Sequence, residues 1–183
     1  MLSLAGAGRE RRSAIAPQLK GVDLAPFLAK PEAAAIDAAR DGALFNFNMW
    51  LYQDAEFMRK VGEAKHAGKN VGKLGLKPDL GKRGAIRSMS DGRHRFSRYF
   101  SPLQHNLPRS FEEILEYNDA ELYDLEADPN EMHNLAADPK AHGELLLAMN
   151  EKLTRLIEDE VGEDRGQFLP ENEAGWNVTT IDP

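Results

Sequence analysis

Cysteine is absent from this chain of 183 residues, and so is any long apolar run. The first absence excludes disulfides, thiolate metal sites and cysteine nucleophiles, and it leaves the redox compartment undetermined. No apolar run approaches the roughly 20 residues that cross a bilayer, so we expect no membrane span. Residues 1–17 have no basic region ahead of their short apolar run, which is unlike a signal peptide. The sequence therefore does not indicate a compartment.

The motifs that identify common active sites are missing as well. The five histidines show no H-x-x-x-H spacing, and there is no Gly-rich phosphate loop, G-x-S-x-G elbow or C-x-x-C pair. The net charge of -7 is unlike that of a general nucleic-acid or acidic-membrane binder. From its residues alone, the chain is expected to be a globular domain without a visible active centre.

Alternation and turn residues predict an antiparallel sheet. In residues 42–50 two phenylalanines and a methionine alternate with two asparagines, which predicts a half-buried strand. Residues 84–100 predict a hairpin, because Asp91-Gly92 supplies the turn residues that tolerate positive φ. Residues 120–125 predict a further strand.

The clearest helix pattern covers residues 138–162. Asp138 is a good N-cap, Pro139 suits the first helical position, and Gly162 ends the pattern. Its apolar stripe has steps of three and four residues, and comprises Leu145, Leu146, Met149, Leu153, Leu156, Ile157 and Val161.

Shorter helices are expected at residues 53–68 and 110–116. Residues 1–8 are interpreted as the tail of a helix, and residues 9–31 as a loop with one helical turn at 22–29. The predicted fold class is α+β, with an antiparallel sheet of about four strands packed against the long C-terminal amphipathic helix.

The stretch ELYDLEADPNEMHNLAADP, residues 121–139, holds six carboxylates. Acidic residues at every second position resemble an EF-hand loop, but Pro129 replaces the required glycine and Leu135 the required bidentate carboxylate. The favoured interpretation is structural, because both Asp-Pro steps are typical of turns and helix caps. A calcium loop is the alternative, and it predicts a large stabilisation by calcium.

A basic segment, residues 82–98, overlaps the predicted hairpin. Its cations are Lys82, Arg83, Arg87, Arg93, Arg95 and Arg98. With the aromatic residues nearby, such a surface can bind single-stranded nucleic acid. The favoured interpretation is a solvated strand face, and a third is a surface that meets an anionic substrate or an acidic partner.

Several stretches, in this order, resemble the C-terminal part of sulfatases of the alkaline-phosphatase-like superfamily. Residues 121–139 are very close to the signature ELYDLxxDPxExxNLA. AIRSMSDGRHRFSRYF, residues 85–100, resembles the hairpin passage (V/I)R…DGRYKYIRY. LSLAGA, LKGVDLAPFLA, ALFNFN and ELLLAMNEKLTRLIEDEVGED resemble other passages, so that the resemblance covers roughly residues 1–169.

The resemblance implies three regions. Residues 1–41 would be the tail of a catalytic-domain helix and a connecting segment, 42–169 the sulfatase C-terminal subdomain, and 170–183 an extended tail. The formylglycine motif C/S-x-P-x-R and the Asp-Asp metal pair of the family are absent. No catalytic or metal residue is therefore carried over, and this chain is expected to hold no cofactor. Calcium and formylglycine are expected in a full-length parent, of which this chain would be a fragment from a truncated gene, a wrongly assigned start or an isolated domain.

The implied function is that of a subdomain of a sulfuric ester hydrolase, inactive alone, that walls the active-site cleft. Its partner would be the N-terminal catalytic domain, and the substrate a small anionic sulfate ester; phosphonate and phosphate esters remain open, and nucleic acid is not expected. Because an anionic ester favours nearby cations, Arg83, Arg87, His94 and His105 are candidates for the substrate-facing rim.

The alternative function is a free-standing module that binds an anionic polymer, such as a sulfated glycan or RNA, through residues 82–98. Such a module should fold as a monomer, and its binding should weaken steeply with salt. A chain that docks on a catalytic domain should instead expose apolar surface within residues 1–50 and tend to associate.

Overall fold

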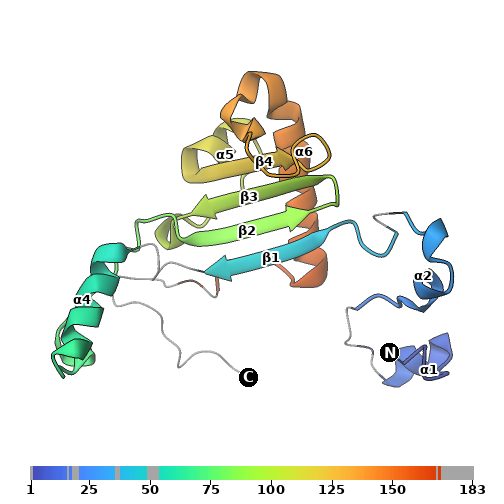
Figure 1. Ribbon diagram of the computed structural model, residues 1–183, viewed down its shortest axis with the longest axis horizontal. Coiled ribbons are helices and arrows are strands. Elements are labelled where there is room, and N and C mark those ends of the chain that lie inside the picture. The colour runs from blue at the N-terminus through green and yellow to red at the C-terminus, as the bar shows by residue number, and fades with distance from the viewer. Residues whose placement is uncertain are drawn as a thin grey trace.

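A four-stranded antiparallel sheet lies at the centre of the computed structural model (Figure 1). The structure describes residues 2–15, 17, 21–35, 38–48, 54–167 and 169. The strands, in their spatial order, are β1 (Ala43–Asn48), β2 (Ala85–Ser90), β3 (His94–Phe100) and β4 (Asn118–Asp124). The α+β class, the hairpin and the last strand are thus confirmed. The strand predicted in residues 42–50 is confirmed over Ala43–Asn48, and Met49 of its alternation lies outside the described residues.

The long helix α6 (Pro139–Glu160) covers one face of this sheet. Asp138 caps it as predicted, because its carboxylate accepts a hydrogen bond from Ala141 N (3.3 Å). The core joins apolar side chains of α6 to those of the strands and of α5 (Phe111–Tyr117): Leu146, Met149, Leu153, Leu156 and Ile157 with Met89, Phe96 and Leu122 of the strands and Ile114 of α5. The predicted stripe is confirmed except at its end, where Val161 is 59 % exposed. The pattern also missed the buried Asn150, whose side-chain amide donates to Pro108 O (2.8 Å).

The remaining helices are short. Two of them, α4 (Ala55–His66) and α5 (Phe111–Tyr117), agree with expectation, and α2 (Ala25–Ala29) is the predicted helical turn. The 3-10 helices are η1 (Pro31–Ala33), η2 (Val71–Lys73), η3 (Pro102–Gln104) and η4 (Leu135–Ala137).

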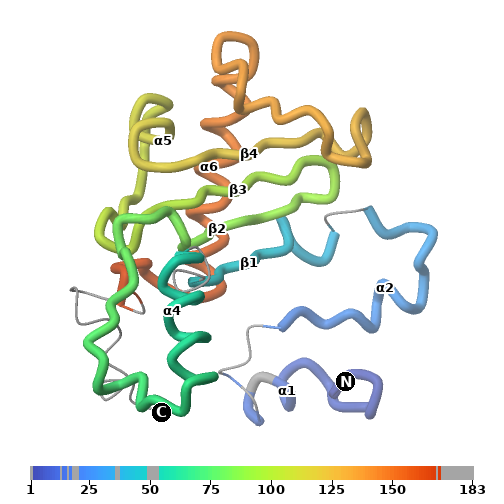
Figure 2. Tube along the Cα trace, turned by 60° about the vertical axis from the view of Figure 1, so that its left-hand side comes forward, coloured from blue at the N-terminus to red at the C-terminus, as the bar shows by residue number. Residues whose placement is uncertain are grey.

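The first segment differs from expectation. Residues 2–6 form turns rather than a helix tail, and α1 (Arg9–Ile15) occupies a stretch expected to be a loop. Arginine, glutamate and alanine in α1 are good helix formers, and this preference decides the local structure where little packing opposes it. Helices α1 and α2 lie away from the sheet in both views (Figures 1 and 2). No helix in the described ranges is long and apolar enough to cross a membrane.

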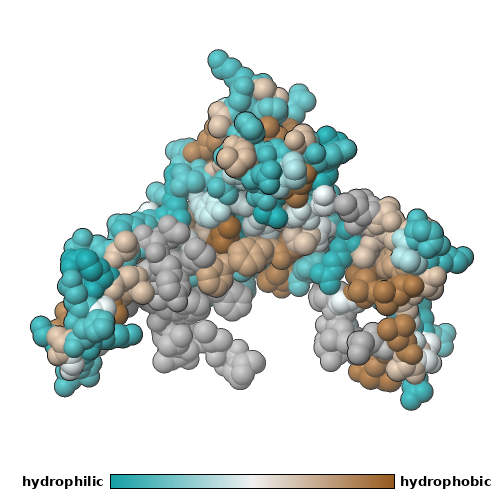
Figure 3. Space-filling view, in the orientation of Figure 1, coloured by the Kyte–Doolittle hydropathy of each residue, from teal (hydrophilic) through white to brown (hydrophobic). Residues whose placement is uncertain are grey.

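The face of the sheet opposite α6 carries exposed aromatic side chains. Phe45 and Phe47 share this face, as the alternation predicted, and are 56 % and 44 % exposed. Asn46 lies on the α6 side, opposite Arg87 in the β1–β2 register. The apolar surface extends over β1 and over α1 and α2 (Figure 3). Other exposed large apolar residues in the N-terminal quarter are Leu2, Leu4, Ile15, Val22, Leu24 and Leu28.

The outer edge of β4 is capped by a side chain. The Asn134 amide accepts from Leu122 N (2.9 Å) and donates to Ala120 O (3.0 Å), as a neighbouring strand would. An uncovered strand edge leaves such groups unpaired and invites association. Asn134 belongs to the NLA end of the acidic stretch, so this residue has a structural role.

Replacing Asn134 tests this cap. We expect Asn134→Ala to lower the free energy of unfolding by about 1–3 kcal/mol, because it leaves strand groups without partners. Asn130→Ala, in the same stretch but exposed, should change it by less than about 0.5 kcal/mol. Urea titration of both variants measures the difference, and equal values for the two would contradict the cap.

Candidate functional site

The four predicted rim residues occupy three places. Arg87 and His105 converge on one carboxylate, that of Asp164. Arg83 lies apart from them, and its guanidinium donates to Asp119 Oδ1 (2.6 Å) and Glu116 O (2.8 Å). His94 lies at the turn end of the β2–β3 hairpin.

Asp164 connects the loop after α6 to the sheet. Arg87 Nε donates to its Oδ2 (2.8 Å), and His105 Nε2 lies 3.0 Å from its Oδ1. A second nitrogen of Arg87, Nη1, donates to Asn48 Oδ1 (3.1 Å). The Arg87 guanidinium also lies 5.1 Å from the centre of the Phe100 ring, within the range of a cation–π contact.

The charge of Asp164 is fixed by these partners. Burial of its carboxyl opposes ionisation, but the hydrogen bonds and charges of His105 and Arg87 outweigh it and hold the pKa well below its usual range. Asp164 is therefore ionised at neutral pH. It balances one of the buried arginines of the sheet.

The second buried arginine, Arg98, lacks such a partner. It lies opposite Arg87 in the β2–β3 register and is 1 % exposed. Its Nε and Nη1 atoms have no hydrogen-bond partner. Burial lowers the pKa of Arg98 to about 10; the charge of Asp164 opposes this shift, and that of Arg87 adds to it. Two buried guanidinium groups thus share one nearby carboxylate.

An unpaired buried charge destabilises the folded state, so removing the charge of Arg98 should not lower the free energy of unfolding. We expect Arg98→Met to leave the free energy of unfolding unchanged or to raise it by up to about 4 kcal/mol, since apolar side chains often replace buried charges without loss. Arg95→Met, on the opposite face of β3, removes an ion pair with Glu131 and should cost about 0–1 kcal/mol. Chemical denaturation measures both variants. If Arg98→Met lowers the free energy of unfolding by more than about 1 kcal/mol, the charge of Arg98 is compensated in the folded chain.

A pocket of about 230 Å³ opens beside Arg87, between β1 and the C-terminal end of α6. Its lining consists of Asn46, Asn48, Arg87, Ile157, Val161, Glu163, Asp164 and Gln167. The His105–Asp164 pair has the form of a general base, but no hydroxyl hydrogen bonds to His105 in the described ranges. The geometry therefore holds a loop in place and offers no activated nucleophile.

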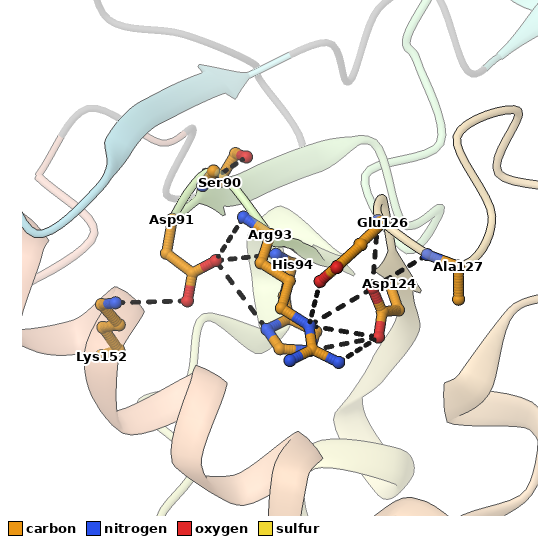
Figure 4. Close-up of polar contacts among 9 residues, drawn as sticks. Ser90, Asp91, Arg93, His94, Asp124, Glu126, Ala127 and Lys152 are labelled. Carbon is orange, nitrogen blue, oxygen red and sulfur yellow. Dashed lines mark hydrogen bonds and ion pairs between the residues drawn. The ribbon is translucent and has the colours of Figure 1, made fainter. Parts of the chain in front are cut away.

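A second polar cluster surrounds His94 (Figure 4). Its ring lies between Asp91, 3.8 Å from Nδ1, and Asp124, 3.9 Å from Nε2. Arg93 pairs with Asp124 (2.9 Å), and Lys152 of α6 pairs with Asp91 (3.2 Å). The hydrogen bond from Arg93, stronger than the opposing effect of burial, lowers the pKa of Asp124 to about 2. This cluster fastens the hairpin to β4 and α6.

The acidic stretch forms turns, as the structural interpretation predicted. Asp124 accepts from Glu126 N (3.1 Å) and Ala127 N (3.3 Å), and Asp128 accepts from His133 N (2.7 Å). Within the described ranges, no group of three or more His, Asp or Glu side chains is arranged to hold a metal ion.

The cations of residues 82–98 are also engaged. Lys82, Arg83, Arg87, Arg93 and Arg95 form ion pairs with Asp54, Asp119, Asp164, Asp124 and Glu131. Arg98 is buried. The hairpin therefore presents little free positive charge for an anionic polymer.

Sequence reasoning missed the residues that organise these clusters. Asp164 lies 77 positions from Arg87, and Asn134 lies 12 positions from Leu122. No local pattern marks Asp164, and Asn134 stands in the sulfatase-like signature of residues 121–139, which gave it no structural role. Asp54 had a usable signal, because it begins a helical pattern and caps α4 by accepting from Phe57 N (3.1 Å).

Comparison with known proteins shows a distant structural likeness. No family model matches this chain, and no curated protein matches it. It is similar to the crystal structure of phosphonate monoester hydrolase of Agrobacterium radiobacter, with a TM-score of 0.43 and 22 % sequence identity. The match covers 86 % of this chain and 24 % of that one, so this chain spans about a quarter of its length. No residue role is transferred from it.

Proposed function

We propose that this chain is the C-terminal subdomain of a sulfate ester hydrolase. The carrying observation is that the two stretches most similar to sulfatases, residues 85–100 and 121–139, interlock. Arg93 of the first pairs with Asp124 of the second, and Phe96 lies opposite Leu122 in the β3–β4 register. The two sulfatase-like stretches thus pack against each other in one sheet, which supports the proposal that this chain has the fold of a sulfatase C-terminal subdomain.

The exposed apolar surface supports a docking role. Phe45 and Phe47 lie on the face of the sheet that α6 leaves uncovered, and further apolar side chains lie on the N-terminal segment. This is the surface expected of a chain that leans on a catalytic domain. The chain would wall one side of the cleft, while the formylglycine, its calcium and the acid–base groups belong to that domain.

The rim candidates divide by their contacts, since the side chains of His94 and His105 are similarly exposed, at 15 % and 20 %. Arg83 and His94 do not contact Asp164, and they are the better candidates to face an anionic ester. Arg87 is buried in its contact with Asp164, and His105 holds the same carboxylate, so these two would position the wall rather than touch substrate. The substrate would be a small sulfate ester, with phosphonate and phosphate esters as alternatives.

The coding sequence of the catalytic domain tests the proposal. We expect a reading frame continuous with this one, or next to it, to encode C/S-x-P-x-R and an Asp-Asp pair. Sequencing the surrounding DNA decides this, and a region without that motif would contradict the proposal.

The alternative, a free-standing module that binds anionic polymers through residues 82–98, makes a different prediction. Such a module should run as a monomer on gel filtration, whereas the exposed Phe45 and Phe47 predict association. Its binding should also vanish when the hairpin arginines Arg83 and Arg95 are replaced. Their ion pairs with Asp119 and Glu131 favour the docking role instead.

A further inference from the structure

Residues 54–82 form an arm that projects from the sheet in both views (Figures 1 and 2). It consists of α4, the 3-10 helix η2 and the connecting turns, and its surface is mainly hydrophilic (Figure 3). Gly68, with φ of 67°, ends α4 in the left-handed region that glycine favours. The chain then returns towards the sheet at Leu80, which is buried.

One carboxylate, that of Asp54, closes the base of the arm. Its Oδ1 caps α4 and also accepts from Lys82 Nζ (3.0 Å), and its Oδ2 accepts from Asp79 N (2.8 Å). The backbone hydrogen bonds from Asp79 and Phe57, followed by that of Lys82, lower the pKa of Asp54 to about 2. A further hydrogen bond, from Ser101 Oγ to Leu80 O (2.8 Å), holds the segment of the arm that returns to the sheet. The arm is therefore held at a defined base.

The far part of the arm carries unbalanced positive charge. Residues 64–78 contain four lysines at steps of four, and no Asp or Glu, in a chain whose net charge is -7. Lys65, Lys69 and Lys73 are exposed and form no ion pair in the part of the chain that the structure describes. The arginines and lysines nearer the sheet are paired with carboxylates: Arg59, Lys60, Lys82 and Arg83.

We infer that this arm binds a sulfated polysaccharide, with Lys65, Lys69 and Lys73 as its contact residues. Exposed, unpaired ammonium groups spread along a projecting arm suit a polymer with repeated negative charges rather than one small anion. The choice of a sulfated polymer rests on the proposed function, because the arm would then hold the chain that bears the reacting ester. The substrate would then be a sulfate ester carried on a polymer rather than the small, free ester of the proposed function.

Two other polyanions fit the arm less well. Single-stranded nucleic acid is bound on aromatic platforms, and no Phe, Tyr or Trp lies between Phe57 and Phe96. Anionic membranes are bound by helices with a broad apolar face, and within residues 64–78 the exposed large apolar side chain is that of Leu74, which is 42 % exposed. The lysines of the arm are thus not accompanied by the aromatic surface that binds single-stranded nucleic acid or by the apolar face that binds an anionic membrane.

The test measures binding of fluorescein-labelled heparin, a sulfated polysaccharide, to the full chain by fluorescence anisotropy across a salt series. We expect Lys65→Ala/Lys69→Ala/Lys73→Ala to weaken binding about tenfold or more at low salt. The slope of log affinity against log salt should fall by about 0.7 for each lost contact, so by about 2. The matched control is Lys30→Ala/Lys140→Ala/Arg155→Ala, which removes the same charge from exposed positions elsewhere and should bind like the unchanged protein.

Circular dichroism checks that both variants are folded, which we expect because the replaced side chains are exposed and form no ion pair with any residue that the structure describes. Unchanged affinity of the arm variant, or an equal loss in the control, would overturn the inference. Tighter binding of single-stranded RNA or of phosphatidylserine vesicles than of heparin would also overturn it. The measurement involves no catalysis. Loss of the proposed hydrolase function would therefore leave the binding result standing, and loss of heparin binding would leave that function untouched.

Discussion

Replacing Asp164 by alanine is expected to lower the free energy of unfolding by about 3–5 kcal/mol. The carboxylate is 10 % exposed and is the shared partner of Arg87 and His105. Without it, the buried guanidinium groups of Arg87 and Arg98 lie opposite each other, and no other carboxylate in the described ranges forms an ion pair with either of them. An uncompensated buried charge is among the largest penalties that one substitution produces.

The adjacent carboxylate provides the control. Glu163 pairs with Arg165 at the surface, so Glu163→Ala should change stability by less than about 1 kcal/mol. Urea denaturation at neutral pH compares the two variants. A loss at Asp164 no larger than at Glu163 would show that the buried arginines are balanced in another way.

The contribution of Asp164 should depend on pH with a defined sign. The pKa of Asp164 in the folded chain lies below the value of about 3.9 for an unfolded aspartate. A carboxyl whose pKa is lowered by folding stabilises the folded state when the pH is above its pKa in the unfolded chain. This stabilisation is lost as the pH falls towards and through its pKa in the folded chain. The difference in free energy of unfolding between the unchanged protein and Asp164→Ala should therefore be largest at neutral pH and should decrease below about pH 4.

The two faces of the sheet should respond very differently to loss of an aromatic ring. Phe96 is fully buried between β3 and α6, and Phe96→Ala should cost about 3–5 kcal/mol through lost burial and the cavity it leaves. Phe45 lies two strands away on the opposite face, and Phe45→Ala should cost less than about 1 kcal/mol because that ring already contacts water.

The same pair of variants also reports on docking. If the open face is a contact surface, Phe45→Ala should reduce association of the chain on gel filtration while Phe96→Ala reduces its stability. Chemical denaturation together with light scattering separates the two effects. A large stability loss at Phe45 would show that this face is covered within the chain itself.

The strands and the helices α4, α5 and α6 followed from local patterns, whereas α1 did not. The Asp91-Gly92 turn, the Asp138-Pro139 helix start and the apolar steps of α6 are each set by neighbouring residues, and each was predicted within a few positions. The alternation in β1 correctly placed Phe45 and Phe47 on one face. It did not reveal that this face lies away from α6, because alternation does not identify the covering element.

The polar clusters did not follow from local patterns. Arg83, Arg87, His94 and His105 were chosen by charge, and only Arg87 and His105 came together, through a carboxylate far along the chain. The sequence did not single out Lys65, Lys69 and Lys73. Which lysines lack an acidic partner becomes known only when the structure shows which cations the carboxylates pair with. Such long-range pairing depends on the tertiary structure.

Hydrolysis of p-nitrophenyl sulfate, in the presence of calcium, tests the central claim most directly. The assay compares this chain alone, the catalytic domain that the proposed function expects to be encoded with it, and the two produced together. The proposed function predicts no turnover by the chain alone and the highest turnover by the pair, because the chain would then supply a wall of the cleft and no reacting group. Turnover by the purified chain alone, abolished by a single substitution within it, would contradict the account.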